Sequence, residues 1–236
     1  MLYISQNNTL RQVSALFSIQ PDPRIIEPYK WIQGDGDAYI RLNSNKVTNG
    51  SVEFEMEFMV DMLSSGPYTN LSGTSKTYNG IKQFAFGLSL IPYSDTTFGC
   101  SYARLAQEPP SAVGTFNIGD TLDVKVTDTT MTINGIEYII GTETYKGVDA
   151  DVQVFWNNFD GDRNKRFKGS VSHIRLWNNN ILVRDLTPAM SIAEIPEENS
   201  YNGTIISANV PGMWDSVEDK FYINANKNNG KFTLKN

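Results

Sequence analysis

Residues 51–61 read "SVEFEMEFMVD", a segment in which apolar and acidic side chains alternate. One set of alternate positions is apolar throughout: Val52, Phe54, Met56, Phe58 and Val60. The positions between them carry Glu53, Glu55, Glu57 and Met59. A period of two residues is that of a strand, because successive side chains of a strand point to opposite faces of its sheet. The segment therefore predicts a strand with one face in a core and the other toward solvent.

The same period recurs along the chain and indicates the fold class. Further alternating runs are "KQFAFGLSLIPY" (82–93), "TLDVKVTD" (121–128), "DVQVFWNNF" (151–159) and "GSVSHIRLW" (169–177). The segment "TMTINGIEYII" (130–140) reads as two strands joined by Asn134-Gly135, a dipeptide typical of tight hairpins. The best helical candidate, "SIAEIPEEN" (191–199), is interrupted by Pro196. Closely spaced strands with turn residues between them predict an all-β protein, a jelly-roll sandwich of two antiparallel sheets.

The composition excludes several classes of function. Hydrophobic residues make up 40% of the 236 residues and charged residues 19%, which is typical of a globular protein. The net charge is −6 and the basic residues are scattered, whereas a nucleic-acid surface requires clustered Lys and Arg. No run approaches the roughly 18 apolar residues of a membrane span, and no basic segment followed by an apolar run predicts a signal peptide. The single cysteine, Cys100, permits no intrachain disulfide and is expected to be a small buried hydrophobe.

A proline-rich connector divides the chain. Pro21, Pro23 and Pro28 fall within "SIQPDPRIIEPYKW" (18–31), and such a segment is stiff and extended. We therefore predict an N-terminal arm over residues 1–28, a docking or assembly segment, and one domain over residues 29–236. The arm alternates weakly and is expected to form a hairpin around Asn7-Asn8. A lone two-stranded unit is marginally stable, so the arm should pack either on its own domain or on a neighbouring chain.

Three segments of the domain carry a resemblance to a known family. They are "YKWIQGDGDAYIRLNSNKVTNGSVEFEMEFMV" (29–60), "GSVSHIRLWNNNILVRDLTPA" (169–189) and "GMWDSVEDKFYINANKNNGKF" (212–232). With these segments, residues 29–236 resemble the concanavalin A-like, laminin-G-like lectin domains of tailed-phage structural (fibre) proteins and gut-bacterial surface proteins. Trp214 stands where that family usually has Tyr. The resemblance implies a lectin-type sandwich in which Trp214, Phe221 and Phe232 supply core and cross-strand contacts for the final hairpin, not a binding patch.

The acidic run raises the question of glycoside hydrolysis. Alternate residues of a strand lie roughly 6.5–7 Å apart, and inverting glycosidases separate their two carboxyl groups by about 6.5–9.5 Å. Neighbouring members of the set Glu53, Glu55 and Glu57 would therefore just fit. However, the strand follows the N-terminal signature, whereas hydrolases on the fold implied by the resemblance keep their carboxylates in mid-chain. No aromatic platform is expected on the acidic face to hold a sugar ring, so we predict a solvated outer face and no enzymatic activity.

The only histidine of the chain lies in the late alternating run. Alternation places Val171, His173, Arg175 and Trp177 on one face of the strand, and Ser172, Ile174 and Leu176 on the other. No serine or cysteine nucleophile motif accompanies His173, so a hydrogen-bonded structural histidine is predicted instead of a general base.

Ligand contacts are expected in loops, where a rigid sandwich usually presents them. The segment 62–80, "MLSSGPYTNLSGTSKTYNG", is predicted to be a long loop in which Tyr68 and Tyr78 could stack on a sugar ring. Packing of this loop against a neighbouring subunit is the alternative. A second candidate is Trp156 with Asn157 and Asn158, an aromatic beside two amides that suits glycan contact, although Trp156 also fits a core position.

One loop has the composition of a cation site. The segment "DGDRN" (160–164) imitates the start of a calcium loop, but its sixth and twelfth positions are Lys165 and Val171, where a helix-flanked loop needs Gly and Glu. The laminin-G-like resemblance implies that loop carboxylates can still hold Ca²⁺, which makes Asp160 and Asp162 the candidate ligands. A solvated turn is the alternative, and no other cofactor is expected.

These observations predict a non-enzymatic structural or adhesive component of a phage virion, of the head-fibre or tail-fibre type. The arm would bind other virion proteins, the protein would form a homo-oligomer, and shallow loop sites would bind host-surface glycans through the avidity of several copies. The alternative is a bacterial surface or secreted carbohydrate-binding module, located on the bacterial cell surface instead of the virion.

Overall fold

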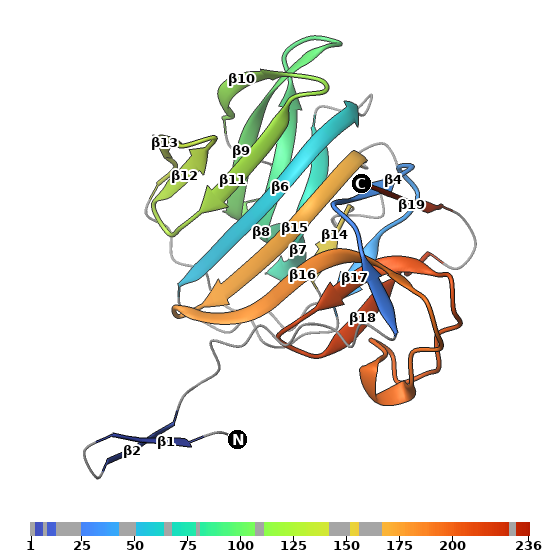
Figure 1. Cartoon of the computed structure of the whole chain (residues 1–236). Helices are drawn as coiled ribbons and strands as arrows, with labels where there is room; N and C mark the ends of the chain where they lie inside the picture. Colours follow the sequence, from blue (N-terminus) through green and yellow to red (C-terminus); the bar gives the residue numbers. More distant parts are fainter. Residues whose placement is uncertain are drawn as a thin grey trace.

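The computed structural model describes residues 3–6, 9–12, 25–42, 51–63, 68–78, 81–106, 111–141, 152–155, 167–226 and 230–236. Within these ranges every regular element is a strand, apart from one 3₁₀ turn, η2 (Glu197–Asn199). Most of the strands belong to two antiparallel sheets that stack face to face (Figure 1). The predicted all-β sandwich is therefore confirmed. No helix in this part of the chain is long and apolar enough to span a membrane.

The large sheet contains eleven strands. Its main path runs in the order β13 (Ile136–Ile139), β12 (Thr130–Ile133), β11 (Thr121–Val126), β6 (Val52–Met62), β15 (Lys168–Asn178), β16 (Ile181–Ser191), β17 (Pro211–Asp215), β18 (Lys220–Ile223). Three further strands join it: β4 (Trp31–Gly34) pairs with β15 and with β19 (Phe232–Lys235), and β3 (Ile26–Pro28) pairs with β16. Strands from both ends of the chain therefore meet in one sheet.

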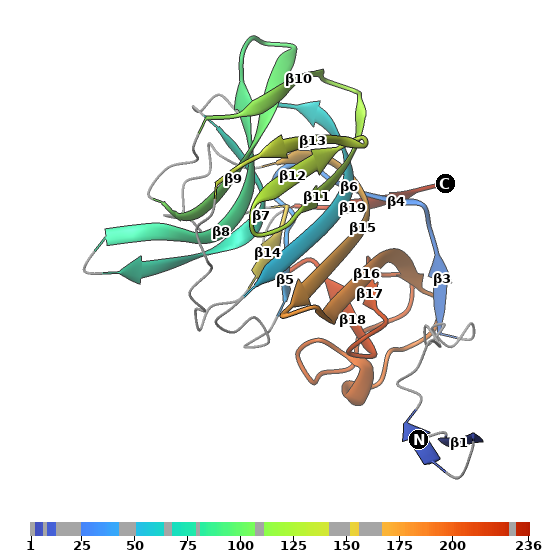
Figure 2. The same ribbon diagram turned by 90° about the vertical axis from the view of Figure 1, so that its left-hand side faces the viewer.

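The small sheet has six strands and covers the inner face of the large one (Figure 2). Its order is β10 (Val113–Asn117), β9 (Thr97–Ala106), β8 (Ile81–Pro92), β7 (Thr69–Tyr78), β14 (Val152–Val154), β5 (Ile40–Leu42). The core lies between the sheets, where the apolar set of β6 meets buried side chains such as Leu88, Leu90 and Cys100. Burial raises the pKa of the Cys100 thiol, so this residue is the small buried hydrophobe that was predicted.

A β-bulge in β15 changes which side chains of this strand point into the core. Val171 lies opposite Phe58 and His173 lies opposite Glu57, so Ser172 is an extra residue on this strand. A bulge shifts the alternation by one position. Val171 therefore points into the core, and Ser172 shares the outer face with His173. The prediction that Val171 and His173 share a face was wrong for this reason.

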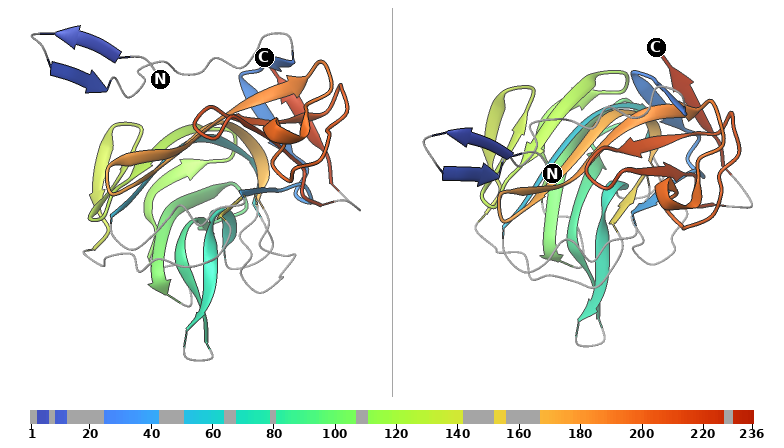
Figure 3. Two further views of the ribbon diagram at one scale, coloured as in Figure 1. Left: turned by 90° about the horizontal axis from the view of Figure 1, so that it is seen from below. Right: turned by 60° about the horizontal axis from the view of Figure 1, so that its bottom comes forward.

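The predicted loop over residues 62–80 is also corrected, because residues 69–78 form strand β7. Its ladder with β8 runs from Thr69 opposite Leu90 to Tyr78 opposite Ile81. The Thr and Tyr residues of the segment favour a strand, while its Ser and Gly residues are typical of a loop. The β7–β8 hairpin extends beyond the rest of the sandwich in Figure 3, and the Asn-Gly pair at 79–80 lies outside the described residues.

The aromatic residues near the C-terminus are buried and make cross-strand contacts, as predicted. Trp214 and Phe221 lie opposite each other in the β17–β18 hairpin and are 1% and 0% exposed. Phe232 belongs to β19 and packs on Phe155, with ring centroids 5.1 Å apart. It therefore helps to close the sheet against β4, and not the β17–β18 hairpin to which it was assigned.

The link between β16 and β17 forms a small cap, residues 192–210, over this hairpin. The cap and its neighbours make a second hydrophobic cluster, which contains Ile26, Ala189, Ile195, Ile206, Trp214 and Phe221. The cap is fastened by a bridge in which Ile195 and Ile206 exchange backbone hydrogen bonds of 2.9 and 3.1 Å. Trp214 and Phe221 are thus covered from the outer side of the large sheet.

Strands β1 (Tyr3–Gln6) and β2 (Thr9–Gln12) form the predicted hairpin in the arm. The register runs from Tyr3 opposite Gln12 to Gln6 opposite Thr9. The two strands thus lie on either side of residues 7–8 in the chain, which confirms the expected position of the hairpin. The packing partner of the arm stays a prediction.

Candidate functional site

Charged side chains gather on the outer face of the large sheet. We name this group the charged strip; it consists of Glu53, Glu55 and Glu57 on β6, Asp123 and Lys125 on β11, Ser172, His173, Arg175 and Trp177 on β15, and Asp185 on β16. Strand register aligns these residues, because cross-strand partners point to the same face of a sheet. Three cross-strand pairs therefore join β6 to β15: Glu57 with His173, Glu55 with Arg175, and Glu53 with Trp177.

Glu55 is the centre of the charged strip. Its Oε1 accepts a hydrogen bond from Arg175 Nη1 at 3.0 Å and lies 3.2 Å from His173 Nε2. The Nε of Arg175 donates in turn to Asp185 Oδ1 at 3.3 Å. One guanidinium thus bridges carboxylates from two neighbouring strands, which orients all three side chains while they remain in contact with solvent.

An aromatic ring lies at one end of the charged strip. The Nζ of Lys125 is 5.6 Å from the centre of the Trp177 ring and 3.8 Å from Glu53 Oε2. The indole is partly exposed and has an ammonium and a carboxylate beside it. The expectation that no aromatic platform shares the acidic face was therefore wrong, because Trp177 lies directly opposite Glu53.

The other end of the charged strip is acidic. The Ser172 hydroxyl donates to Glu57 Oε2, and its oxygen is also 3.3 Å from His173 Nδ1. Burial raises the pKa of the neighbouring Asp123; Glu55 and Glu57 add to this effect, while His173 and Arg175 oppose it. Three carboxylates thus share a small area of the sheet, although burial remains the largest cause of the raised pKa of Asp123.

The contacts of Ser172, His173 and Glu55 have the connectivity of a hydrolase triad but not its arrangement. In a triad, the nucleophilic hydroxyl donates its proton to the histidine. Here the hydroxyl donates to Glu57, and Ser172 is only 9% exposed. Each of the three glutamates is held by a partner on a neighbouring strand, so the charged strip offers an ordered set of hydrogen-bonding groups and not an evident acid–base pair.

The residues predicted to bind ligand do not join the charged strip. Tyr68 directly precedes β7 and is buried, with 4% exposure, so its ring face is not open to a sugar. Tyr78 is the last residue of β7, and a strand of this length separates the two tyrosines by about 30 Å. The two cannot contact one sugar ring together.

The remaining predicted site residues lie outside the part of the chain that the structure describes. They are Trp156, Asn157 and Asn158 as glycan contacts, and Asp160 and Asp162 as Ca²⁺ ligands. These assignments stay predictions.

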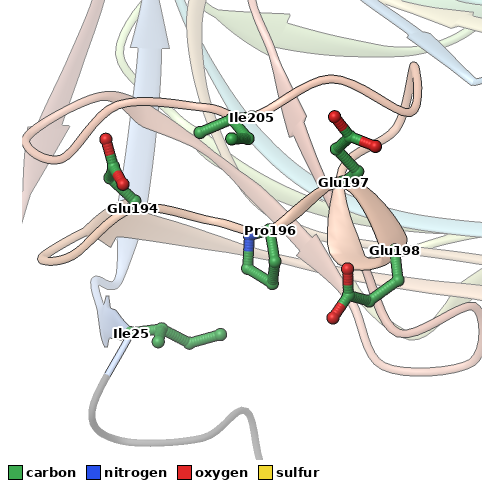
Figure 4. Close-up of a pocket in the computed structure, with 6 residues that line it drawn as sticks. All are labelled: Ile25, Glu194, Pro196, Glu197, Glu198 and Ile205. Carbon is green, nitrogen blue, oxygen red and sulfur yellow. The ribbon is translucent and has the colours of Figure 1, made fainter.

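A second surface feature lies beside the cap. Ile25, Pro196 and Ile205 line an open hollow of about 510 Å³ together with three carboxylates, Glu194, Glu197 and Glu198 (Figure 4). Among the described residues, no group of three or more His, Cys, Asp or Glu side chains is arranged to hold a metal ion. The hollow is thus an apolar surface with acidic groups around it.

The importance of Trp177 could not be read from local sequence. The strand of Glu53 and the strand of Trp177 are more than 100 residues apart, and their register depends on the bulge at Ser172. The available signal was the alternate positions His173, Arg175 and Trp177, which match the acidic positions of β6 in number and spacing.

Comparisons with known proteins support the fold. No family model matches the sequence, and no curated protein matches it either. Solved structures do match. A protein of Bacteroides ovatus, for which carbohydrate binding has been proposed, superposes with a TM-score of 0.51 at 11% identity, over 89% of this chain and 61% of that one. This chain therefore spans less than two thirds of that relative.

Two more distant structures have TM-scores of 0.41. One is a heptameric pentraxin of Limulus polyphemus, with 14% identity over 66% of this chain and 77% of that one. The other is domain 4 of an extracellular arabinanase of Geobacillus stearothermophilus, solved with arabinotriose, with 17% identity over 61% of this chain and 68% of that one. Of these three, only the Bacteroides ovatus structure is similar enough to show the fold, a β-sandwich of two antiparallel sheets.

Proposed function

We propose that this protein is a non-enzymatic carbohydrate-binding sandwich and that sugar binds on the charged strip, over the Trp177 ring. The observation that carries the proposal is the Trp177 indole with Lys125 and Glu53 beside it on an open sheet face. An aromatic ring offers an apolar surface to the C–H groups of a sugar. The carboxylates and the guanidinium offer acceptors and paired donors to its hydroxyl groups.

The ion pairs of the charged strip support binding because they hold the polar groups in place before a ligand arrives. Glu55 and Arg175 each have two partners, so little side-chain freedom is left to lose on binding. The same contacts support the proposed absence of catalysis, since Glu55 and Glu57 are engaged with cationic or hydroxyl partners. The likeness to the Bacteroides ovatus protein is consistent with a sugar-binding role but concerns the fold.

A glycan array followed by calorimetry on the best ligand tests the proposal. Trp177→Ala should weaken binding by at least about tenfold, or about 1.4 kcal/mol. Trp31→Ala is the matched control, because Trp31 is also a partly exposed tryptophan with a lysine, Lys30, 5.6 Å from its ring centre. Unchanged affinity in Trp177→Ala, or equal losses in both variants, would refute the assignment of the site.

The N-terminal arm supports a second part of the proposal, namely that the arm attaches the domain to a partner protein and leaves the charged strip accessible to ligands. The β1–β2 hairpin is too small to be stable without packing on something. Attachment within a phage virion is suggested by the sequence resemblance, whereas a bacterial surface module needs only the glycan-binding face. Deletion of residues 1–24, which keeps β3 in the large sheet and Ile26 in its cluster, should abolish incorporation into a particle in the first case; unchanged incorporation would contradict it.

A further inference from the structure

Strand β13 is the outermost strand of the large sheet, and no other strand of the described residues pairs with its outer edge. It pairs with β12 on one side and ends the strand order on the other (Figure 1). Two of its four residues are exposed isoleucines, Ile136 at 61% and Ile139 at 84%. Glu137 is its only charged residue, and natural edge strands usually carry more protection than this against pairing with another chain.

The hairpin geometry shows which backbone groups point outward. Asn134 and Gly135 have positive φ angles of 48° and 82°, so the turn has two central residues and Ile133 and Ile136 form the first hydrogen-bonded pair. Hydrogen-bonded and non-hydrogen-bonded pairs alternate along an antiparallel ladder. The N–H and C=O groups of Glu137 and Ile139 therefore point away from β12, and within the described residues they have no other hydrogen-bond partner.

We propose that β13 pairs with β13 of a second copy, antiparallel and centred on Tyr138, to form a two-fold dimer with one continuous sheet. In this register Glu137 of each copy lies opposite Ile139 of the other. These two pairs use every outward backbone group named above and form four hydrogen bonds across the axis. The register centred on Glu137 would instead place two like charges directly opposite each other, which is unfavourable.

Side-chain positions favour the same register. Glu137 and Ile139 share the outer face, because they lie opposite Thr132 and Thr130, so Ile139 would cover the aliphatic stem of Glu137 from the second copy. On the inner face, Ile136 would lie opposite Ile140 of the second copy. The two most exposed isoleucines of the strand would thus lose contact with water, which stabilises association.

The dimer would present both copies of the charged strip in the same direction. A two-fold axis between antiparallel strands of one sheet is perpendicular to that sheet, so the two outer faces point the same way. If the proposed sugar site is correct, the dimer binds a surface with two sites at once, and avidity compensates for a weak single site. The pairing itself does not depend on sugar binding.

Sedimentation of the full chain over a wide concentration range tests the pairing without any glycan. The wild-type protein should form a dimer, and Ile139→Glu should raise its dissociation constant by at least about tenfold by placing a second carboxylate opposite Glu137. Ile181→Glu is the matched control, since Ile181 is 66% exposed on another part of the sheet. A wild-type monomer at all concentrations, or an equal effect of both substitutions, would overturn the proposal.

A charge reversal then tests the register. Adding Glu137→Lys to Ile139→Glu places opposite charges across the axis and should restore the dimer. Both positions are on the surface, so circular dichroism should show that all variants stay folded. If the single variant dissociates and the double variant fails to reassociate, the register centred on Tyr138 is wrong.

Discussion

The guanidinium of Arg184 donates a hydrogen bond of 3.2 Å to Asp215 Oδ2, and the two side chains are 1% and 0% exposed. Arg184 belongs to the "LVRD" segment and Asp215 to "WDSVED", two segments that carry the family resemblance. Arg184 Nη1 also lies 2.9 Å from Glu218 Oε1. The two segments are therefore joined by a buried charge pair, and removing either charge would leave the other buried without its partner, at a large cost in desolvation.

Arg184→Met is expected to lower the free energy of unfolding by about 3–5 kcal/mol, because it leaves a buried carboxylate without its cation. Adding Asp215→Asn should recover part of this loss. The asparagine carbonyl can still accept the hydrogen bonds that Asp185 N and Val217 N donate to Asp215 Oδ1. Urea unfolding of the single and double variants measures the difference; a cost below about 1 kcal/mol for Arg184→Met would contradict this account.

The cap provides a matched comparison of two isoleucines. Ile195 is 0% exposed against Trp214 and Phe221, whereas Ile205 of the same cap is 59% exposed. Ile195→Ala should cost about 2–5 kcal/mol through lost burial and a cavity. Ile205→Ala should stay within about 0.5 kcal/mol. Thermal unfolding separates the two, and similar losses would mean that the cap is not packed as described.

Local sequence was sufficient to predict a strand wherever one face of that strand is apolar. The alternation of β6 and the Asn134-Gly135 hairpin follow from residues close together in the chain, whereas the burial of Trp214 was implied by the family resemblance. Strand β7 was missed because its Ser and Gly residues are typical of a loop. Its strand conformation is supplied by pairing with the hydrophobic strand β8, a tertiary contact that overrides local propensity.

The charged strip could not be predicted for a different reason. Its contacts join residues of β6 and β15 that are 115 to 120 positions apart. Their register depends on the single extra residue Ser172, and a shift of one position exchanges the faces of a strand. The chemistry of each residue was visible in the sequence, but not which residues share a face.

Two adjacent positions in β15 test how tightly this strand is packed. A Cβ on Gly169 would collide with the backbone oxygen of Met59 on β6 and with the Phe167 ring. Gly169→Ala is therefore expected to cost about 1–3 kcal/mol, since the neighbouring backbone must move. Ser170→Ala should be neutral or stabilising, because the Ser170 hydroxyl is buried and has no hydrogen-bond partner among the described residues. The reverse order of stability in denaturant would refute both explanations.

The pH dependence of stability should reveal the burial of Asp123 beside two other carboxylates. Burial, together with Glu55 and Glu57, raises the pKa of Asp123 above its ordinary value of 3.8. The folded protein therefore binds the proton of the Asp123 carboxyl more tightly than the unfolded chain does. The contribution of Asp123 to the free energy of unfolding falls as the pH rises through the raised pKa. Asp123→Asn removes the charge, so the variant should be more stable than the wild type at pH 7, and this advantage should shrink as the pH is lowered toward 3.8.

The control for this prediction is Asp95→Asn, in the exposed turn 93–96, which removes one surface charge far along the chain from the charged strip. Urea unfolding of the wild type and both variants across the acidic range gives the comparison. An advantage of Asp123→Asn that grows on acidification would mean that the Arg175 and His173 cations dominate at Asp123. The carboxylates would then be fully compensated, and the charged strip would be electrically balanced instead of acidic at this end.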